Sequence, residues 1–422
     1  MPGGCWRVTM TEKIYAKKLT LLKDEVISRI DMSRDVSDDE IRDIIRDAIY
    51  SMKQTDNLSL ADMEELFRTL FFEVRRLGIL EELIADSSVT EIMVNGVNDI
   101  FIERNGAISR WERSFESEEK LRSVIQQIVS KSNRVVNEAS PIVDARLENG
   151  ARANVVMNPV AINGPILTIR RFPDEPISMK NLVAFSSVTP AAVEYLKKLV
   201  ISGYNIFVSG GTGSGKTTFL NALSQYIPHD ERIVTIEDSA ELQIQGVENL
   251  VRLETRNANV EGLKEITIRD LIKTSLRMRP DRIIVGEIRD GAALDFLSAA
   301  NTGHDGSLCT GHANSAKDML SRIETMVLMG MDLPLPAIRR QMASAIDIIV
   351  HLGRLRDKSR KVLEITEMMG LENGEFVLNP IFRFEEEGET KNGLVKGTLK
   401  KTGKLVYIEK LCRKGLYDKD NV

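Results

Sequence analysis

The sequence is poor in cysteine, and its few cysteines are scattered along the chain. Cys5, Cys309 and Cys412 are the only three among 422 residues, and no two of them form a Cys-x-x-Cys pair. Neither a zinc module nor a disulfide framework is therefore indicated. This usage fits a reducing compartment best, and we expect no zinc in the protein.

Long apolar runs are also absent. A helix that spans a bilayer needs about 20 consecutive apolar residues, whereas the longest uncharged run, Ala153 to Ile169, is interrupted by Pro159, Gly164 and Pro165. The first residues lack the apolar core of a signal peptide. The sequence therefore predicts neither a membrane-spanning segment nor a secretory signal.

No excess of basic charge is present. The chain has 57 Lys and Arg against 62 Asp and Glu, a formal net charge of -5. This balance argues against a protein whose main task is to coat nucleic acid, although a local basic groove is compatible with it. The length allows two or three domains, and the 42% of hydrophobic residues is ordinary for a globular chain.

The chain does contain a strong phosphate-binding pattern. Residues 210–217 read Gly-Gly-Thr-Gly-Ser-Gly-Lys-Thr and fit the P-loop, Gly-x4-Gly-Lys-[Ser/Thr]. An apolar run at 205–208 predicts a buried strand before the loop, and residues 217–223 predict a helix that ends before Pro228. A flexible Gly/Ser turn is the alternative, but the strand-loop-helix context favours a nucleoside triphosphate site.

The chemistry expected of this loop follows from its residue types. Glycines let the backbone bend so that several N–H groups point at one anion, and the helix N-terminus adds a partial positive charge. We expect Lys216 to reach the outer phosphates of ATP and the Thr217 hydroxyl to bind Mg²⁺. The predicted nucleotide-binding residues are Gly211, Thr212, Gly213, Ser214, Gly215, Lys216, Thr217 and Thr218.

Two further apolar runs end in acidic residues. The run 232–236 precedes Glu237, and the run 282–285 precedes Gly286 and Glu287. Ligands of open parallel sheets lie outside the carboxyl ends of the strands. Because Gly286 stands where a Walker B motif usually has Asp, Glu287 is the candidate for activating water and for an outer-shell contact to Mg²⁺. Glu237 either assists it or belongs to an acidic turn.

Two of the four histidines, His304 and His312, fall within nine residues of each other. Zinc would need further ligands at suitable spacing, and with Cys309 between the two histidines a fourth ligand is still missing. We interpret both histidines as hydrogen-bonding sensors of the γ-phosphate. Buried structural histidines are the alternative.

The pattern of apolar residues divides the chain into four regions. A helical module is predicted over 1–80 from helical spacing and from capping boxes that begin at Ser37 and Ser59. A small α+β domain follows over 81–173, with one helix near 121–129, and a linker over 174–186. Residues 187–422 alternate strands and helices before a β-rich tail, which predicts an α/β fold with a mainly parallel sheet. Strands of the small domain are expected near 91–94, 100–103, 142–147, 151–157 and 166–171.

Four motifs together resemble the secretion ATPases, the motors of type II and type IV secretion and of type IV pili. The P-loop, Thr-Ile-Glu-Asp at 235–238, Val-Gly-Glu-Ile-Arg-Asp at 285–290 and Thr-Gly-His-Ala-Asn at 310–314 look like that family's Walker A, Asp box, atypical Walker B and His box. Within the family the chain looks most like the CpaF-type ATPases of Tad (tight adherence) pili. Stretches at 91–96, 276–281, 344–347 and 354–357 match that branch, and the tetracysteine zinc insert of many type II motors is missing.

The resemblance, which runs from about residue 77 to the end, implies a hexameric ring of RecA-like domains that hydrolyse ATP to ADP and phosphate with Mg²⁺. Nucleotide would lie between the P-loop domain and the chain's own N-domain, which would supply Arg152, Arg170 and Arg171 to the phosphates. Arginine suits this role because it stays charged and binds oxygens bidentately. Pairing with surface acids is the alternative for each arginine.

The resemblance also implies a motor that assembles or retracts a pilus from the cytoplasmic side of the inner membrane, with membrane platform proteins as partners. Under this hypothesis, Thr217 and, through water, Glu287 hold Mg²⁺. The candidate catalytic residues are Glu287, Glu237, Lys216, Arg152, Arg170, Arg171, His312 and His304.

Three alternatives stay open at this point. A type IV secretion motor would share the fold and chemistry but move a different cargo. A RecA-like ATPase that depends on nucleic acid would use the basic run at 354–361, which a solvated hairpin also explains. An inactive nucleotide-binding scaffold is disfavoured because Lys216, Thr217 and Glu287 occur together.

Overall fold

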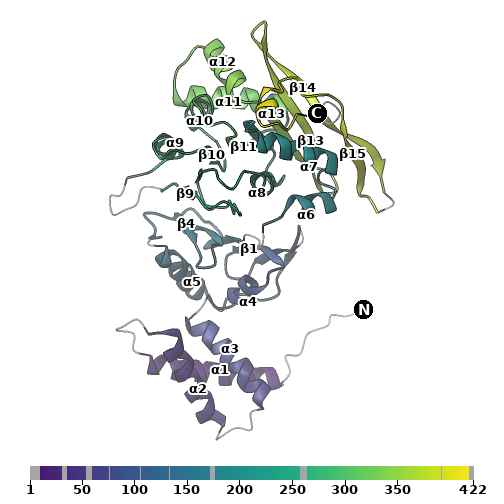
Figure 1. The fold of residues 1–422 in the computed structure, drawn as a ribbon. Coiled ribbons are helices and arrows are strands. Elements are labelled where there is room, and N and C mark those ends of the chain that lie inside the picture. The colour runs from purple at the N-terminus through teal and green to yellow at the C-terminus, as the bar shows by residue number, and fades with distance from the viewer. Residues whose placement is uncertain are drawn as a thin grey trace. The chain divides into compact units, whose positions relative to one another are not determined.

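The computed structural model describes residues 10–30, 36–53, 59–75, 77–104, 106–132, 134–171, 176–256, 264–390 and 392–417. The chain divides into two compact units, residues 1–172 and 173–422. Each unit has a sheet and a core of its own (Figure 1). Among the described helices, none combines the length and the apolar character needed to cross a bilayer.

Three helices open the first unit and share a small apolar core. Leu22, Ile45 and Leu70 are among its buried members, one from each helix, as expected for amphipathic helices. The third helix begins with a complete capping box, because the Ser59 hydroxyl accepts the N–H of Asp62 while the Asp62 carboxylate accepts the N–H of Ser59. The helices are α1 (Met10–Arg29), α2 (Asp38–Lys53) and α3 (Leu60–Arg75).

The rest of the first unit is an antiparallel sheet with strand order β3-β2-β1-β6-β5-β4. One face of this sheet packs against two helices in a common core that includes Ile92, Ile169 and Leu121. The sequence predicted five of the strands and the longer helix, but not the short elements β3 and α4. The elements are α4 (Leu80–Ala85), β1 (Val89–Asn95), β2 (Ile100–Arg104), β3 (Ala107–Arg110), α5 (Glu118–Lys131), β4 (Ile142–Arg146), β5 (Arg152–Val156) and β6 (Ile166–Arg170).

The second unit is built on one large sheet with strand order β15-β14-β13-β12-β7-β11-β10-β8-β9. The strands from β12 to β9 in this order pair in parallel, and β13, β14 and β15 extend the sheet in antiparallel fashion. The α/β class predicted from the sequence is confirmed. The strands are β7 (Ile206–Gly210), β8 (Ile233–Glu237), β9 (Leu250–Glu254), β10 (Arg282–Val285), β11 (Leu308–His312), β12 (Ile348–Arg354), β13 (Arg360–Glu372), β14 (Glu375–Glu389) and β15 (Val395–Lys401).

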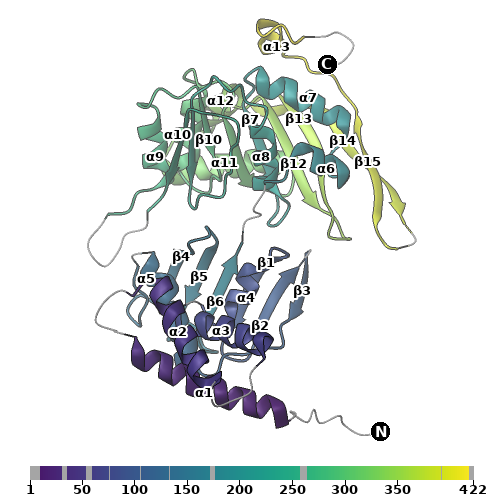
Figure 2. The same cartoon turned by 60° about the horizontal axis from the view of Figure 1, so that its bottom comes forward.

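Helices cover both faces of the parallel strands, which explains why those strands are apolar at nearly every position. Val208 of β7 points into the core that includes residues of α6, α7 and α8, whereas its neighbour Phe207 points into the core with α9, α10, α11 and α12. Figure 2 shows α6 and α7 near β12 and β13, apart from α9 and α10. The helices are α6 (Met179–Ala184), α7 (Pro190–Ile201), α8 (Lys216–Ser224), α9 (Ile268–Ser275), α10 (Ala292–Ala300), α11 (Ala316–Gly330), α12 (Leu335–Ala345) and α13 (Glu409–Arg413).

The first of these helices corrects one prediction. The sequence assigned 174–186 to a linker, but residues 179–184 form α6, and its Met179 and Leu182 are buried in the core of the second unit. Ser178 begins the helix with a capping box that involves Asn181. The proline-rich start of this stretch concealed the helix, because its single turn and a half gives too little periodicity to recognise.

Candidate nucleotide site

The P-loop joins the carboxyl end of β7 to the first turn of α8. Gly213 and Gly215 have positive φ angles of +70° and +91°, which side chains other than glycine rarely tolerate. Gly210 is constrained differently, because a Cβ there would lie 2.5 Å from both the Leu352 carbonyl oxygen and the Ser214 hydroxyl oxygen. The loop therefore needs its glycines for two reasons, left-handed backbone and close packing.

Lys216 is buried, with 7% of its surface exposed, and its ammonium group faces the loop. Its Nζ donates to the carbonyl oxygens of Gly210 and Gly211, each at 3.1 Å. A third bond at 3.2 Å joins Nζ to His312 Nδ1. Because an ammonium group can only donate, Nδ1 must be the unprotonated nitrogen of this imidazole.

Glu287 follows β10 and is held by two residues. Arg289 donates to both carboxylate oxygens, from Nε at 2.9 Å and from Nη2 at 3.1 Å, and His312 Nε2 lies 3.0 Å from Oε1. Burial raises the pKa of Glu287, but the Arg289 hydrogen bonds and the nearby positive charges outweigh burial and leave the pKa below its ordinary value. Glu287 is therefore an oriented carboxylate, ionised at neutral pH.

Glu237, at the end of β8, is in a different state. It is 3% exposed, and its Oε2 accepts the N–H groups of Glu241 at 2.7 Å and Leu242 at 2.8 Å. Its other oxygen, Oε1, is buried and has no hydrogen-bond partner among the described residues. Burial raises the pKa of Glu237 to about 7. The two carboxyl groups thus differ in charge near neutral pH.

The strand that precedes Glu287 explains where the Glu237 side chain fits. Strands β8 and β10 are parallel neighbours, with Ile236 beside Val285. A Cβ at Gly286 would lie 3.0 Å from Glu237 Cγ and 3.4 Å from its Oε2. The glycine at the usual Walker B aspartate position therefore leaves room for a carboxyl group from the neighbouring strand.

The structure brings His312 into the site but not His304. His312 ends β11, at the same sheet edge as the P-loop, since it lies beside Gly210 in the parallel register. His304 precedes β11, a strand of five residues, so it lies at the opposite edge, roughly 13 Å or more away at about 3.3 Å per residue. Its Nδ1 is 3.1 Å from the carbonyl oxygen of Ala299. The prediction that His304 senses the γ-phosphate does not fit this position.

Two of the three predicted arginines share one face of the first unit's sheet. Arg152 and Arg170 are directly opposite each other on β5 and β6, and Arg146 is opposite Arg152 on β4. Register partners lie on the same face, and this face is the one turned away from the core, because Ala153 and Ile169 are buried on the other. The row continues with Glu91 on β1, beside Arg170. Arg152 also lies 3.8 Å from Asp144.

The Arg171 side chain lies on the opposite side of the chain from that of Arg170. Side chains alternate along a strand, and the Arg171 guanidinium donates to the carbonyl oxygen of Asp86 near the start of β1. Sequence reasoning missed two residues with polar roles, Arg146 in the arginine row and Arg289 as a partner of Glu287. The available signal for Arg146 was the Asn149-Gly150 pair, because these residue types favour a hairpin turn and such a turn places Arg146 opposite Arg152.

The residues of the second unit's site fit a nucleoside triphosphate with Mg²⁺. The Ser214 hydroxyl oxygen in the P-loop is buried without a hydrogen-bond partner in the described chain, as Glu237 Oε1 is, and an anion with its metal would supply such partners. Thr217 lies half-buried in the first turn of α8. Its hydroxyl, with Glu287 acting through water, is the donor set that Mg²⁺ prefers.

The family model for type II/IV secretion system proteins matches residues 73–392. The chain belongs to the type II/IV secretion system ATPase superfamily. VirB11, the type IV secretion system protein of Brucella suis biovar 1 (strain 1330), is 33% identical over 301 residues, which are 65% of this chain and 83% of VirB11. A candidate conjugal transfer protein of Mycobacterium tuberculosis (strain ATCC 25618 / H37Rv) is 35% identical over 314 residues, or 72% of this chain and 89% of that protein.

A solved structure supports the fold of the superfamily for this chain. The crystal structure of the pilus retraction motor PilT with bound ADP aligns with a TM-score of 0.50 and 21% identity, over 80% of this chain and 86% of PilT. An identity this low speaks for the fold alone. The residues from Gly210 to Thr217 and from Gly286 to His312 described above lie within the part that the family model matches.

Proposed function

We propose that this chain is a Mg²⁺-dependent ATPase that works as a hexameric motor for a Tad or related type IV pilus at the inner membrane. The observation that carries the ATPase proposal is the hydrogen-bonded chain from Lys216 through His312 to Glu287, beside a P-loop with an unpartnered buried hydroxyl. A phosphate-binding cation and a water-orienting carboxylate are thus linked by one imidazole.

The proposed reaction uses these residues in order. Lys216 exchanges its bonds to the loop carbonyls for the outer phosphate oxygens of ATP. Glu287 accepts a hydrogen bond from the attacking water, whose oxygen forms a bond to the γ-phosphorus as the bond to the ADP oxygen breaks. Glu237, with a pKa of about 7, is suited to take up the proton that the water releases. Thr217 and, through water, Glu287 would hold Mg²⁺, which would neutralise charge at the phosphates.

The arginine row of the first unit is the proposed second half of the site. Arg152 and Arg170 would contact the phosphates of the bound nucleotide and stabilise charge that develops on them. Loss of the γ-phosphate would then remove this contact, which is the proposed source of the conformational change. Staggered closure around a ring would turn ATP hydrolysis into mechanical work on membrane platform proteins. In this proposal the second unit is a RecA-like domain.

The Tad assignment rests on the sequence stretches at 91–96, 276–281, 344–347 and 354–357 and on the absence of a tetracysteine insert. A type IV secretion motor is the second candidate, favoured by the 33% identity to VirB11. Both candidates use the same chemistry, so they differ in the machine that is driven. The peripheral, inner-membrane location belongs to the proposal in either case.

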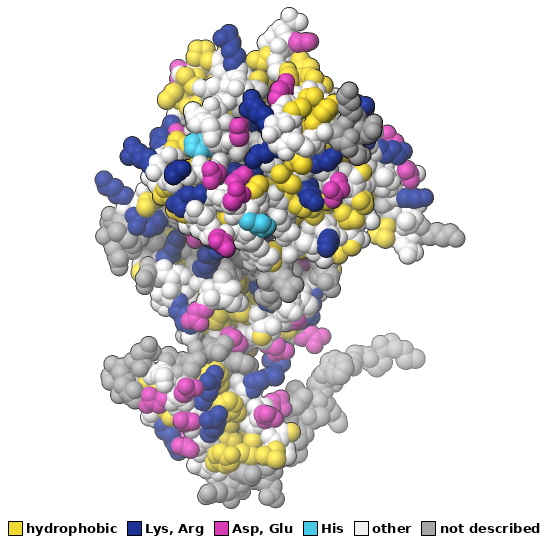
Figure 3. All heavy atoms as spheres, viewed as in Figure 1, with side chains coloured by type: hydrophobic (Ala, Val, Ile, Leu, Met, Phe, Trp, Pro, Cys, Tyr) yellow, Lys and Arg dark blue, Asp and Glu magenta, His cyan; other side chains and the backbone are white. Residues whose placement is uncertain are grey.

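The nucleic-acid alternative loses support from the basic turn at 354–361. Arg356 pairs with Glu386 and Glu389, at 2.6 and 2.5 Å. Arg360 Nε donates to the Gly213 carbonyl oxygen of the P-loop at 2.9 Å, and Lys361 Nζ to the Ser186 carbonyl oxygen at 2.7 Å. These cations serve internal contacts. On the surface that Figure 3 shows, basic and acidic side chains are interspersed rather than gathered into a basic groove.

Turnover of ATP by the Lys216→Ala variant tests the proposed site. We expect the rate to fall by about 100-fold or more, because the principal cation at the γ-phosphate is lost. Lys180→Ala, an exposed lysine on α6, is the control and should turn over ATP normally. Undiminished hydrolysis by Lys216→Ala would rule out this site, and an inactive wild type would favour the scaffold hypothesis.

A deletion strain separates the two candidate machines. Loss of surface pili favours the Tad pilus, and loss of substrate transfer favours the type IV secretion motor.

A further inference from the structure

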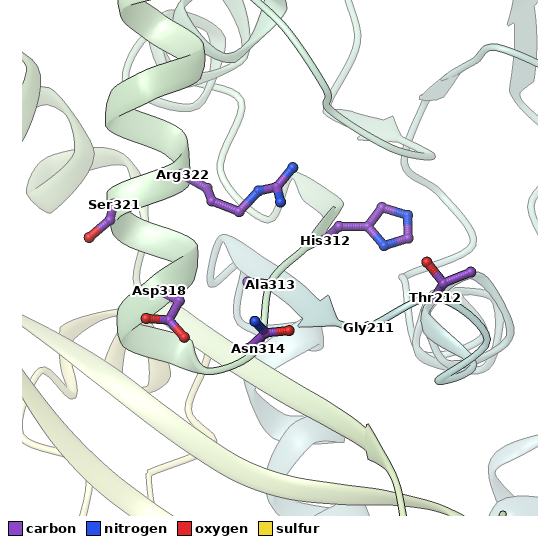
Figure 4. Close-up of a pocket in the computed structure, with 8 residues that line it drawn as sticks. All are labelled: Gly211, Thr212, His312, Ala313, Asn314, Asp318, Ser321 and Arg322. Carbon is purple, nitrogen blue, oxygen red and sulfur yellow. The ribbon is translucent and has the colours of Figure 1, made fainter.

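A pocket of about 450 Å³ opens beside the P-loop, between that loop and helix α11. Its walls include Gly211 and Thr212 of the loop, His312 at the end of β11 with Asn314 just after it, and Arg322 of α11 (Figure 4). One water molecule takes about 30 Å³ of liquid volume, so the pocket has room for a small hydrated anion. His312 is shared between this pocket and the chain that links Lys216 to Glu287.

Arg322 is the cation of the pocket. Its side chain extends from α11 toward His312 in Figure 4. Within the described residues its guanidinium forms no ion pair, unlike Arg289 and Arg339, which are each paired with carboxylates. A guanidinium presents several N–H donors in a planar fork that matches the oxygens of a phosphate. Asn314 also lines the pocket, and its side-chain amide is a neutral donor.

We propose that this pocket binds the inorganic phosphate cleaved from ATP, with Arg322 as its principal ligand. The inference rests on the proposed function and goes beyond it, because it assigns a second anion site between the P-loop and α11. The position of His312 supports it: this side chain lines the pocket and also contacts Glu287, next to which the cleaved phosphate forms. A phosphate that moves past His312 exchanges the Lys216 charge for the Arg322 charge, and leaves from the open side of the pocket.

Asp318 lines the same pocket and carries the opposite charge to Arg322. A carboxylate near a bound anion weakens binding, which suits a site that must release its ligand. Removal of the two charges should therefore have opposite effects. Arg322 acts as ligand, and Asp318 lowers the affinity.

Equilibrium binding of radiolabelled inorganic phosphate to the full chain, with and without saturating ADP, tests the site. We expect Arg322→Ala to weaken phosphate binding by about tenfold or more, and Arg322→Lys to retain part of the affinity. Asp318→Asn should tighten binding by roughly twofold to fivefold. Arg340→Ala, an exposed arginine on α12, is the matched control and should bind phosphate as the wild type does. Inhibition of ATP turnover by added phosphate should change in the same order.

An unchanged phosphate affinity in Arg322→Ala overturns the inference, and so does weaker binding in both Arg322→Ala and Asp318→Asn, because a structural disturbance gives the same sign for both. These outcomes are separate from failure of the proposed function. If the chain binds no ADP, the ATPase proposal is contradicted. The binding of phosphate without ADP still tests whether the pocket is an anion site.

Discussion

His312 and Glu287 are joined by a hydrogen bond of 3.0 Å from the imidazole Nε2 to the carboxylate Oε1. The direction of this bond follows from the other side of the ring, where the Lys216 ammonium donates to Nδ1 at 3.2 Å. The imidazole is therefore neutral, with its proton on Nε2, and donates to Glu287. Burial lowers the pKa of His312, which keeps this neutral form at physiological pH.

The two histidines of this region form a natural matched pair. His312→Ala removes the donor to Glu287 and the acceptor for Lys216, so we expect ATP turnover to fall by about 10- to 100-fold with little change in ADP affinity. His304→Ala removes a similar ring at the opposite sheet edge and should leave turnover within about twofold. Steady-state kinetics and ADP titration of both variants check this. Equal losses of turnover in the two variants would contradict the assignment of His312 alone to the site.

The raised pKa of Glu237 predicts that the free energy of unfolding depends on pH. Its pKa rises from 4.5 to about 7 in the folded chain, so the unfolded state ionises first and the folded state is increasingly disfavoured as pH rises from about 4.5 to about 7. The full difference corresponds to about 3 kcal/mol. Glu237→Gln cannot ionise, so its stability relative to the wild type should increase across this window and then level off above it. Urea denaturation of both proteins at pH 5 and pH 8 measures the difference.

A constant difference between the two proteins at both pH values would show that Glu237 does not titrate in this range. Asp270→Asn is a useful control, because its carboxylate is exposed at a capping box and its pKa is lowered, chiefly by the Thr267 backbone hydrogen bond. Its deficit in stability relative to the wild type should be the same at pH 5 and pH 8, because both lie above the ordinary carboxyl pKa of 3.8, and should disappear only at more acid pH.

The sequence alone placed several candidate residues at one edge of the sheet, because the rule that ligands gather at the carboxyl ends of parallel strands needs only the positions where strands end. Glu237 and Glu287 each follow a short apolar run, and His312 lies at the same edge as the last residue of β11. His304 was misplaced since its Thr-Gly-His context looks like that of His312. Strand β11 lies between His304 and His312 in the chain, and it places the two histidines at opposite edges of the sheet.

Other features depended on pairing between strands, which residue spacing does not show. Arg146 joins Arg152 and Arg170 only through the register of β4, β5 and β6. The contact between Gly286 and Glu237 arises because β8 and β10 are neighbours although a strand and a helix separate them in the chain. The Arg289 clamp on Glu287 depends on a loop conformation after β10.

Arginine variants of the first unit test the proposed second half of the site. Arg152→Ala and Arg170→Ala should each lower the turnover number by about 10²- to 10³-fold while ADP affinity changes far less, because charge on the γ-phosphate is stabilised mainly in the transition state. Arg171→Ala is the matched control, because its guanidinium already donates to the Asp86 carbonyl oxygen on the other side of the chain. It should cost about 1 kcal/mol of stability and little activity.

Arg146→Ala extends the same comparison along the row. Arg146 is opposite Arg152 in the register, so its loss should lower turnover less than loss of Arg152 if it acts by shaping the potential of the row. Steady-state kinetics of all four variants at two salt concentrations measure this, since a potential shared by several charges is screened by salt more than a direct contact. A ranking with Arg171 as the most damaging position would mean that the phosphate-contacting face of the sheet is the opposite one.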